Sequence, residues 1–447
     1  MLQSCNLDQI KEKNMQLTEK ILNILKEEIV PAQGCTEPIA IAYVSAKAVE
    51  VLGHVPDKMD VYVSGNMIKN VKSVAIPNSG GMVGIEAAVA LGAVAGDAND
   101  ELMVISSLDN KDIEEVQEYL DTHTINVIHD KTDVKLYVKV VAHYKEEHAL
   151  VEIKHFHTNI TKIQKNGKLL IDQICNDFDF KTTSEDRSIL SIKTIYDIAK
   201  TMDIKKVEPL FAQVIELNSN IANAGLSEEF GVNIGSLIQK NMNSGLYGKD
   251  VRNQCASFTS AGSDARMSGC SLPVMTTSGS GNQGMTASLP IIKYCLERNL
   301  SHEQLIRGLL FSHLTTIHLK TNVGRLSAFC GVMCAASAVA GGIAFLEDAD
   351  YETVSNAITN SLGNISGVIC DGAKASCATK IATGIYAAFD SSMLALNNKC
   401  LHGGEGIISN DIEQTIKNIG VLAQSGMKKT DEVILDIMQT CKKDKDK

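Results

Sequence analysis

The spacing of apolar residues predicts helices at the start of the chain. Between residues 8 and 30, apolar side chains such as Leu17 and Ile24 recur every three to four positions, which is the spacing of one helix face. Pro31 ends this pattern, because proline is poorly tolerated inside a helix. A second helix is predicted over residues 36–52.

From residue 59 to residue 170 the pattern becomes that of a small α/β domain. Short runs rich in Val, Ile and Tyr, with alternating apolar and polar positions, are typical of strands. Segments with helical spacing stand between them. The predicted strands are 60–64, 101–106, 134–141 and 149–153, and the predicted helices are 84–96 and 111–120.

The C-terminal part is predicted to be mainly helical. Residues 181–203 open with a polar run that is typical of a linker or a helix start, and long stretches rich in Ala, Gly, Ser and Met follow. Residues 326–346 carry no charge and are just long enough to span a bilayer. Because this segment is mostly Ser, Cys, Gly and Ala, a central helix buried among other helices is the favoured interpretation.

These patterns predict an α+β fold, in which a predominantly helical domain accompanies a smaller α/β domain. A chain of 447 residues is longer than one ordinary hydrophobic core supports. We expect N-terminal helices in residues 1–53 that pack on the helical domain, the α/β domain in residues 54–180, and the helical domain in residues 181–447.

Composition excludes several classes of partner. A net charge of -11, without a basic block beyond the short C-terminal tail, argues against nucleic acids and anionic membranes. The first twenty residues alternate charged and apolar positions, unlike a secretory signal. We therefore expect a cytoplasmic protein that acts on small molecules. In that reducing compartment its twelve cysteines are expected as buried side chains, metal ligands or reactive thiols.

Three cysteines in the C-terminal part are candidate ligands of an iron-sulfur cluster. Cys330 is followed after 39 intervening residues by Cys370, and after six more by Cys377. Thiolates are the usual ligands of such clusters, but the spacing alone is equally compatible with buried structural cysteines, and Cys334 and Cys400 lie nearby. If three cysteines held a four-iron cluster, the fourth iron would be open to a substrate as a Lewis acid.

Cys35 is a further candidate because of its local sequence, Val-Pro-Ala-Gln-Gly-Cys-Thr-Glu-Pro-Ile-Ala. Gly34 permits a tight turn, and the residues from Thr36 to Pro38 are typical of a helix start. A thiol at the positive end of a helix is expected to have a lowered pKa, which favours a role as base, nucleophile or ligand. A cysteine that only packs at the helix cap is the alternative.

A glycine-rich turn is the candidate substrate-binding segment. It precedes a predicted helix, so its backbone N–H groups would be arranged to bind a carboxylate or a phosphate. It matches neither the Walker loop nor the dinucleotide-binding fingerprint, and an ordinary turn between helices is the alternative. The residues are Ser278, Gly279, Ser280, Gly281, Asn282 and Gln283.

Other polar positions rank behind this turn. His313 and Lys320 are seven residues apart and share a helix face, where they would contact an anionic substrate, with His313 as a proton carrier. A hydrogen-bonded interior histidine and a solvated lysine are the alternative. Residues 64–70 and 77–81 are second-rank substrate loops or ordinary turns.

Three of these motifs together resemble the L-cysteine desulfidase family, also described as serine dehydratase alpha chain-like. They are Pro-Ala-Gln-Gly-Cys-Thr-Glu-Pro-Ile-Ala, Gly-Ser-Gly-Asn-Gln-Gly and Cys-Asp-Gly-Ala-Lys-Ala-Ser-Cys-Ala. The resemblance spans nearly the whole chain, and the chain is also similar, more distantly, to the iron-sulfur L-serine dehydratases. It implies that residues 181–447 form an iron-sulfur catalytic domain and that the smaller domain accompanies it.

The resemblance also implies residue roles. Cys330, Cys370 and Cys377 would hold a [4Fe-4S] cluster, and Cys35 would be a catalytic base or a fourth contact to the cluster. The last two cysteines of the dehydratases are spaced more widely than here, which leaves Cys334 as a competing ligand.

The expected reaction is the α,β-elimination of L-cysteine to sulfide, pyruvate and ammonia. Cys35 is the first candidate for the base that removes the α-proton and His313 the second, while the glycine-rich turn would hold the substrate carboxylate. L-serine dehydration on the same cluster, a pyridoxal-phosphate lyase and a non-catalytic redox sensor are the alternatives. An amino acid is thus the expected partner, and a homo-oligomer is left open.

Overall fold

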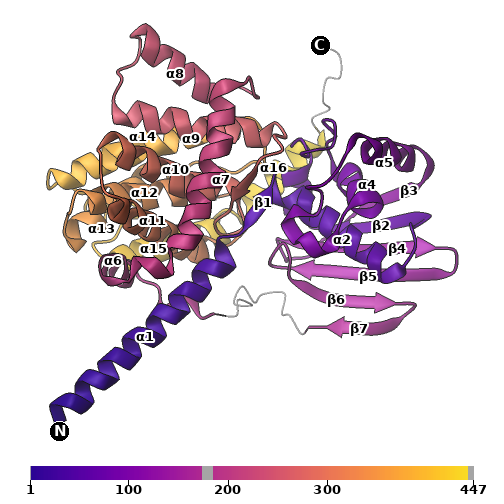
Figure 1. Ribbon diagram of the computed structural model, residues 1–447, viewed down its shortest axis with the longest axis horizontal. Coiled ribbons are helices and arrows are strands. Elements are labelled where there is room, and N and C mark those ends of the chain that lie inside the picture. Colours follow the sequence, from indigo (N-terminus) through magenta and orange to yellow (C-terminus); the bar gives the residue numbers. More distant parts are fainter. Residues whose placement is uncertain (1, 174–184, 441–447) are drawn as a thin grey trace.

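The computed structural model describes residues 2–173 and 185–440. It has the α+β fold that the sequence predicts, with a mainly helical body. Figure 1 shows a smaller body with a sheet beside this helical body, and the N-terminal helix extending away from both. Two clusters of buried apolar residues form separate cores for the two bodies.

The helical body surrounds α12 (Gly331–Leu346), whose residues are buried from Val332 to Leu346. Its many small side chains let the neighbouring helices approach closely, and α12 packs on α10, α11, α13 and α14. Segment 326–346 thus contributes the buried central helix that its composition favours. The other helices are α1 (Leu2–Glu28), α6 (Ile192–Thr201), α7 (Glu208–Ser227), α8 (Ile234–Ser244), α9 (Val251–Met267), α10 (Gly281–Glu297), α11 (His302–Val323), α13 (Tyr351–Ile365), α14 (Ser376–Leu396), α15 (Ile412–Val421) and α16 (Lys428–Thr440).

Short 3-10 segments at Arg187–Ile189 and Ile204–Lys206 and a π-helical turn at Leu422–Gly426 complete the helical body. The predicted linker at 181–203 contains the first of these segments and α6, while its opening residues 181–184 lie outside the described part of the chain. Within the described residues, we find no helix with the length and apolar character needed to cross a bilayer.

The smaller body is a six-stranded sheet in the order β3-β2-β4-β5-β6-β7, and Figure 1 shows its helices on one side of the sheet. Only the β2–β3 pair is parallel among these strands. The strands are β2 (Lys58–Val63), β3 (Thr124–His129), β4 (Tyr137–Tyr144), β5 (Glu147–Lys154), β6 (Ile160–Lys165) and β7 (Lys168–Asp172). The helices are α2 (Thr36–Leu52), α3 (Gly65–Val71), α4 (Ile85–Ala95) and α5 (Asn110–Thr122).

The predicted strand at 101–106 is wrong. The 3-10 helix η1 (Ala98–Met103) occupies this region, because the Asp97 side chain caps it by accepting a hydrogen bond from the Asn99 N–H. Glu101 has a φ angle of 47°, which is incompatible with a strand. The apolar residues of the segment, including Val104 and Ile105, are nevertheless buried in the core of the small body.

Sequence patterns also missed β3, β6 and β7. The side chains of β3 are partly or fully exposed, and all five of β7 are exposed, so neither strand has the strict apolar alternation that identifies a strand. Residues 64–70, considered a loop, contain most of α3, which Ser64 caps through a hydrogen bond from the Met67 N–H.

The two N-terminal helices join different cores. The end of α1 packs into the helical body through residues such as Ile21 and Ile24. By contrast, α2 is buried on nearly all sides and packs against β4, β5 and α4 of the smaller body. The division expected from the sequence had placed both helices on the helical domain.

A two-stranded ribbon joins the two bodies near the candidate site. Strand β1 (Pro31–Gln33) pairs antiparallel with β8 (Pro273–Met275). Cys35 follows the first strand by two residues, and Ser278 follows the second by three. The ribbon therefore places the Cys35 turn beside the glycine-rich turn, although 242 residues separate Thr36 from Ser278 in sequence.

Candidate active site

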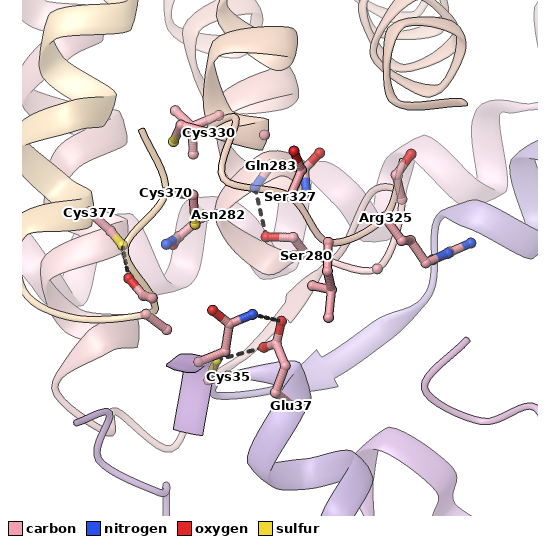
Figure 2. A pocket seen from close by; sticks show the side chains of 18 of the residues that line it. Cys35, Glu37, Ser280, Asn282, Gln283, Arg325, Ser327, Cys330, Cys370 and Cys377 are labelled. Carbon is pink, nitrogen blue, oxygen red and sulfur yellow. Dashed lines mark hydrogen bonds between the residues drawn. The ribbon is translucent and has the colours of Figure 1, made fainter. Parts of the chain in front are cut away.

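One cleft gathers most of the predicted site residues (Figure 2). Residues of both bodies line it. They include Cys35, Glu37, Asn70, His157, Arg266, Ser278, Gly279, Ser280, Asn282, Gln283, Lys320, Arg325, Cys330, Cys370 and Cys377.

Four cysteines converge on this cleft from three elements. Cys35 is the N-cap residue of α2 and Cys330 that of α12, while Cys370 precedes α14 and Cys377 lies in its first turn. Backbone hydrogen bonds fix two of them, since the Cys330 N–H donates to Val368 O at 3.1 Å and the Cys370 N–H donates to Ala328 O at 2.7 Å. The tertiary fold thus joins residues that the sequence holds far apart.

The three C-terminal thiols interact electrostatically with one another. Burial raises the pKa of Cys330, and the neighbouring Cys370 and Cys377 raise it further. Burial also raises the pKa of Cys377. Cys330 and Cys377 therefore stay protonated without a ligand, but coordination of a metal cation stabilises the thiolate form.

The donor set and its charges fit an iron-sulfur cluster. In such a cluster each cysteine binds a different iron, so that the thiols surround a volume instead of meeting at one point. Among the described residues, no group of three or more His, Cys, Asp or Glu side chains is placed to hold a metal ion. Lys380 lies close enough to interact with Cys330 and Cys370, and Lys320 interacts with the same two thiols. These ammonium groups would balance the negative charge of cluster thiolates.

The competing ligand Cys334 does not line the cleft. It lies one turn further along α12 than Cys330 and is fully buried in the core of the helical body. Burial raises its pKa to about 11. The geometry therefore favours Cys330 over Cys334.

Cys35 forms a hydrogen-bonded unit with Glu37. The Cys35 thiol donates to Oε2 of Glu37 at 3.0 Å, and Nδ2 of Asn70 donates to Oε1 at 3.1 Å. Cys35 caps α2 as predicted, but its expected low pKa is wrong. Burial and the adjacent Glu37 carboxylate raise the pKa of the thiol, which outweighs the helix N-terminus and the charge of Arg266.

Glu37 is the anionic group at this end of the cleft. Burial alone would raise its pKa, but the charge of a protonated His157, the Cys35 hydrogen bond and Arg266 together lower it. Burial in turn lowers the pKa of His157 to about 4, so the imidazole is neutral at pH 7. The hydrogen bonds from Cys35 and Asn70 then keep the Glu37 carboxylate ionised.

Several buried polar atoms of the cleft have no hydrogen-bond partner within the described part of the chain. They are Oδ1 of Asn70, Nε2 of His157, Nε of Arg266 and Oε1 of Gln283. Such atoms are costly to bury unpaired, and a guanidinium as enclosed as Arg266, which is 2% exposed, calls for an anionic partner. The cleft therefore offers both acceptors and donors to a polar ligand.

The glycine-rich turn leads into α10 as predicted. Ser280 is the N-cap residue, and its side chain accepts from the Gln283 N–H. Gly279 has a φ of 78°, and a Cβ atom there would lie 2.6 Å from Nη1 of Arg325. Gly281 lies against the other guanidinium, since its Cβ would meet Nε of Arg266 at 2.4 Å. Glycine thus lets two arginines approach the turn, although Gly281 does not itself line the cleft.

The two remaining sequence candidates have different positions. Lys320 lines the cleft, where burial lowers its pKa, and it donates to Arg325 O at 3.1 Å. His313 is fully buried outside the cleft-lining set, with Nδ1 2.8 Å from Oγ1 of Thr277 and its ring against Phe211. Burial lowers the pKa of His313 to about 3. His313 therefore contacts Thr277, the residue before the glycine-rich turn, and does so from outside the cleft.

Sequence reasoning missed several functional residues of the cleft, which include Glu37, Asn70, His157, Arg266 and Arg325. Weak signals existed for two, since Asn70 ends a segment considered as a substrate loop and Arg325 precedes the Cys330 motif. Arg266 lies in an Ala- and Ser-rich helix, and nothing in that sequence marks it as a site residue. Only its burial in the structure does. Arg325 is fixed by two 2.9 Å contacts between its Nη2 and the Glu28 carboxylate.

Comparison with known proteins assigns the family. The UPF0597 protein of Fusobacterium nucleatum is 61% identical over 420 residues, which cover 94% of this chain and 98% of that protein. UPF0597 proteins of Desulfitobacterium hafniense and Lachnoclostridium phytofermentans are 44% and 43% identical, covering 96% and 94% of this chain and 98% and 99% of their own lengths. Residues 99–436 match the family described as serine dehydratase alpha chain, and the chain belongs to this family.

Proposed function

We propose that the protein is a lyase that eliminates sulfide from L-cysteine, with a [4Fe-4S] cluster held by Cys330, Cys370 and Cys377. The family is associated with iron-sulfur serine dehydratases, which supports an amino-acid lyase. The observation that carries the proposal is the convergence of these cysteines, Cys35 and the glycine-rich turn on one polar cleft. When bound, the cluster would supply a Lewis acid for the substrate's leaving group.

The cationic groups of the cleft suit the substrate carboxylate. The enclosed Arg266 guanidinium and the N-terminus of α10 both favour an anion. Asn282 and Gln283 line the same cleft and can add side-chain hydrogen bonds. Holding the carboxylate there would fix the orientation of the α-hydrogen within the cleft.

The acidic groups of the cleft suit the substrate ammonium group. An ammonium group donates three hydrogen bonds, and the cleft offers the Glu37 carboxylate together with the unpartnered Oδ1 of Asn70. A cleft lined by both a buried guanidinium and a buried carboxylate is complementary to a zwitterionic amino acid.

Cys35 and Glu37 would act together as the base that removes the α-proton. The pair shares one negative charge across a 3.0 Å hydrogen bond, so that the thiol proton can pass to Glu37 as sulfur accepts the proton from carbon. This keeps Cys35 as the first candidate base. The core position of His313 makes it the weaker second candidate.

L-serine is the second candidate substrate, favoured by the description of the matching family. A hydroxyl and a thiol differ at one atom, and no residue of the cleft visibly selects sulfur. Anaerobically prepared protein should release pyruvate from both amino acids, and we expect the higher kcat/KM with L-cysteine, accompanied by sulfide. A higher value with L-serine would assign the dehydratase reaction instead.

A further comparison tests the cluster and the enzyme class. Active protein should be brown and contain about four irons per chain. Full activity in colourless, iron-free protein would refute the cluster. Brown protein that turns over neither amino acid would support a redox sensor.

A further inference from the structure

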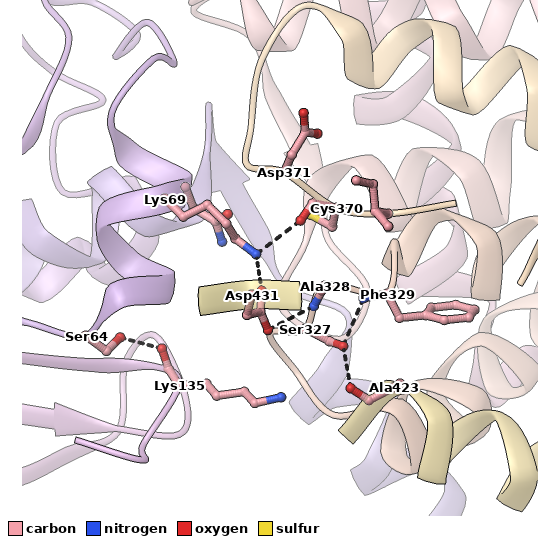
Figure 3. Close-up of polar contacts among 12 residues, drawn as sticks. Ser64, Lys69, Lys135, Ser327, Ala328, Phe329, Cys370, Asp371, Ala423 and Asp431 are labelled. Atoms are coloured by element: carbon pink, nitrogen blue, oxygen red, sulfur yellow. Dashed lines mark hydrogen bonds and ion pairs between the residues drawn. The ribbon is translucent and has the colours of Figure 1, made fainter. Parts of the chain in front are cut away.

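An ion pair outside the cleft connects the two loops that carry Cys330 and Cys370. Nζ of Lys69, at the end of α3, lies 2.6 Å from Oδ1 of Asp431 in α16 (Figure 3). The Lys69 side chain is 2% exposed and that of Asp431 13% exposed. The pair therefore joins the small body to the C-terminal helix, with the Lys69 ammonium group buried and the Asp431 carboxylate largely buried.

Each partner also binds one cysteine loop. Lys69 donates to the carbonyl oxygen of Cys370 at 3.1 Å, and Oδ2 of Asp431 accepts from the Ala328 N–H at 3.0 Å. The two loops are themselves joined, because the Cys370 N–H donates to Ala328 O and the Cys330 N–H donates to Val368 O. The ion pair is therefore hydrogen-bonded to both cysteine loops, and these loops are joined to each other by backbone hydrogen bonds.

The packing around Gly372 strengthens this connection. Gly372 has a φ of 100°, and a Cβ atom there would lie 2.4 Å from the backbone oxygen of Lys69. The loop between Cys370 and Cys377 therefore lies directly against α3. On the other side, Ser327 accepts from the Phe329 N–H and donates to Ala423 O at 3.3 Å.

We propose that Lys69 and Asp431 are positioning residues, which clamp the loops of Cys330 and Cys370 in the geometry needed to retain the cluster. The inference rests on the cluster assignment of the proposed function. A buried ion pair contributes little net stability, but removal of one partner leaves the other charge uncompensated. Loss of the clamp should therefore loosen the two loops more than it destabilises either core.

The chain contains a matched control. Lys428 and Asp133 form a 2.8 Å ion pair between the same two parts, α16 and the small body. Their side chains are 62% and 56% exposed, and the pair contacts neither cysteine loop. Lys428→Met therefore removes an ion pair across the same boundary without touching the clamp.

The experiment compares Asp431→Ala, Lys69→Met and Lys428→Met in the full chain. Hydrogen exchange in the iron-free protein, followed by mass spectrometry, measures opening of segments 326–332 and 368–374. Iron content and the time course of cluster loss in air measure retention after anaerobic reconstitution. We expect exchange and cluster loss to be about tenfold faster in the two clamp variants, as loss of a charge-assisted hydrogen bond implies, and unchanged in Lys428→Met.

The outcomes separate this inference from the proposed function. If the clamp variants exchange and lose iron at the rate of Lys428→Met, the clamp is refuted. If wild-type protein takes up no iron, the cluster assignment fails, while the exchange rates still test the loop contacts. Should Asp431→Ala not fold, Lys69→Met decides, because it leaves the Asp431–Ala328 hydrogen bond in place.

Discussion

The Cys35 thiol donates a 3.0 Å hydrogen bond to the carboxylate of Glu37, two residues further along the chain. Both side chains are buried, and the carboxylate also accepts from Asn70. The helix start at Thr36 places the pair at the edge of the cleft. The sequence motif predicts a helix start with a candidate reactive thiol, and the structure adds Glu37 as the hydrogen-bond partner of that thiol.

The pair can be tested by proton exchange at the substrate. Because both residues share the proton-accepting charge, we expect Cys35→Ser and Glu37→Gln each to lower kcat by about 10²- to 10⁴-fold. Both should also slow exchange of the α-hydrogen of L-cysteine with deuterium from D2O, measured by NMR. Cys295→Ser, at a buried site outside the cleft, is the control. Unchanged exchange in both variants would remove the pair from the proton transfer.

The ligand assignment predicts a selective loss of iron. Cys330→Ala, Cys370→Ala and Cys377→Ala should each lose the cluster absorbance and most of the iron, because Cys35, the other cysteine that lines the cleft, is hydrogen-bonded to Glu37 instead. Cys334→Ala should keep its iron, since this residue does not line the cleft. Iron analysis after anaerobic purification checks both. Retention of iron in the first three variants would contradict the assignment.

Gly279→Ala should weaken substrate binding without loss of iron. Its new Cβ would lie 2.6 Å from Nη1 of Arg325 and 3.0 Å from the His157 ring, which forces both groups to move. We expect the KM for L-cysteine to rise by about tenfold or more. Gly245→Ala is the matched control, because Gly245 has a similar φ of 80° with no neighbour within 4 Å. An equal KM in the two variants would show that only backbone strain matters.

His313 should make stability depend on pH. Burial lowers its pKa from 6.5 to about 3, so between these values the unfolded chain binds a proton that the folded chain does not. Stability is therefore lost as pH falls below 6.5, by about 1.4 kcal/mol per pH unit. His313→Gln cannot titrate and should show a shallower decline in denaturant unfolding between pH 6.5 and 4.5. The exposed His302→Gln is the control, and equal slopes in all three proteins would contradict this prediction.

The sequence by itself determined the class of fold and the position of several helices in the first half of the chain. Apolar spacing identified α2, α4 and α5, since burial of one helix face is a local property of the chain. It also singled out the cysteines and the glycine-rich turn as candidates, through their motifs and the family that these motifs resemble. The strand at 101–106 failed, since a side-chain cap at Asp97 overrode an apolar run.

Only the tertiary structure decided which residues share the cleft and how they are charged. Pairing of β1 with β8 brings Cys35 to the glycine-rich turn, and the ladder between the Ala328 and Cys370 segments brings two distant cysteines together. The pKa of Cys35 depends on desolvation and on the Glu37 carboxylate, which outweigh the helix N-terminus that its sequence suggests. The periodicity of a sequence shows which face of a helix or strand is buried, but not which other segment covers that face. The desolvation of a side chain and the charges near it depend on the covering segment, so its pKa cannot be derived from periodicity.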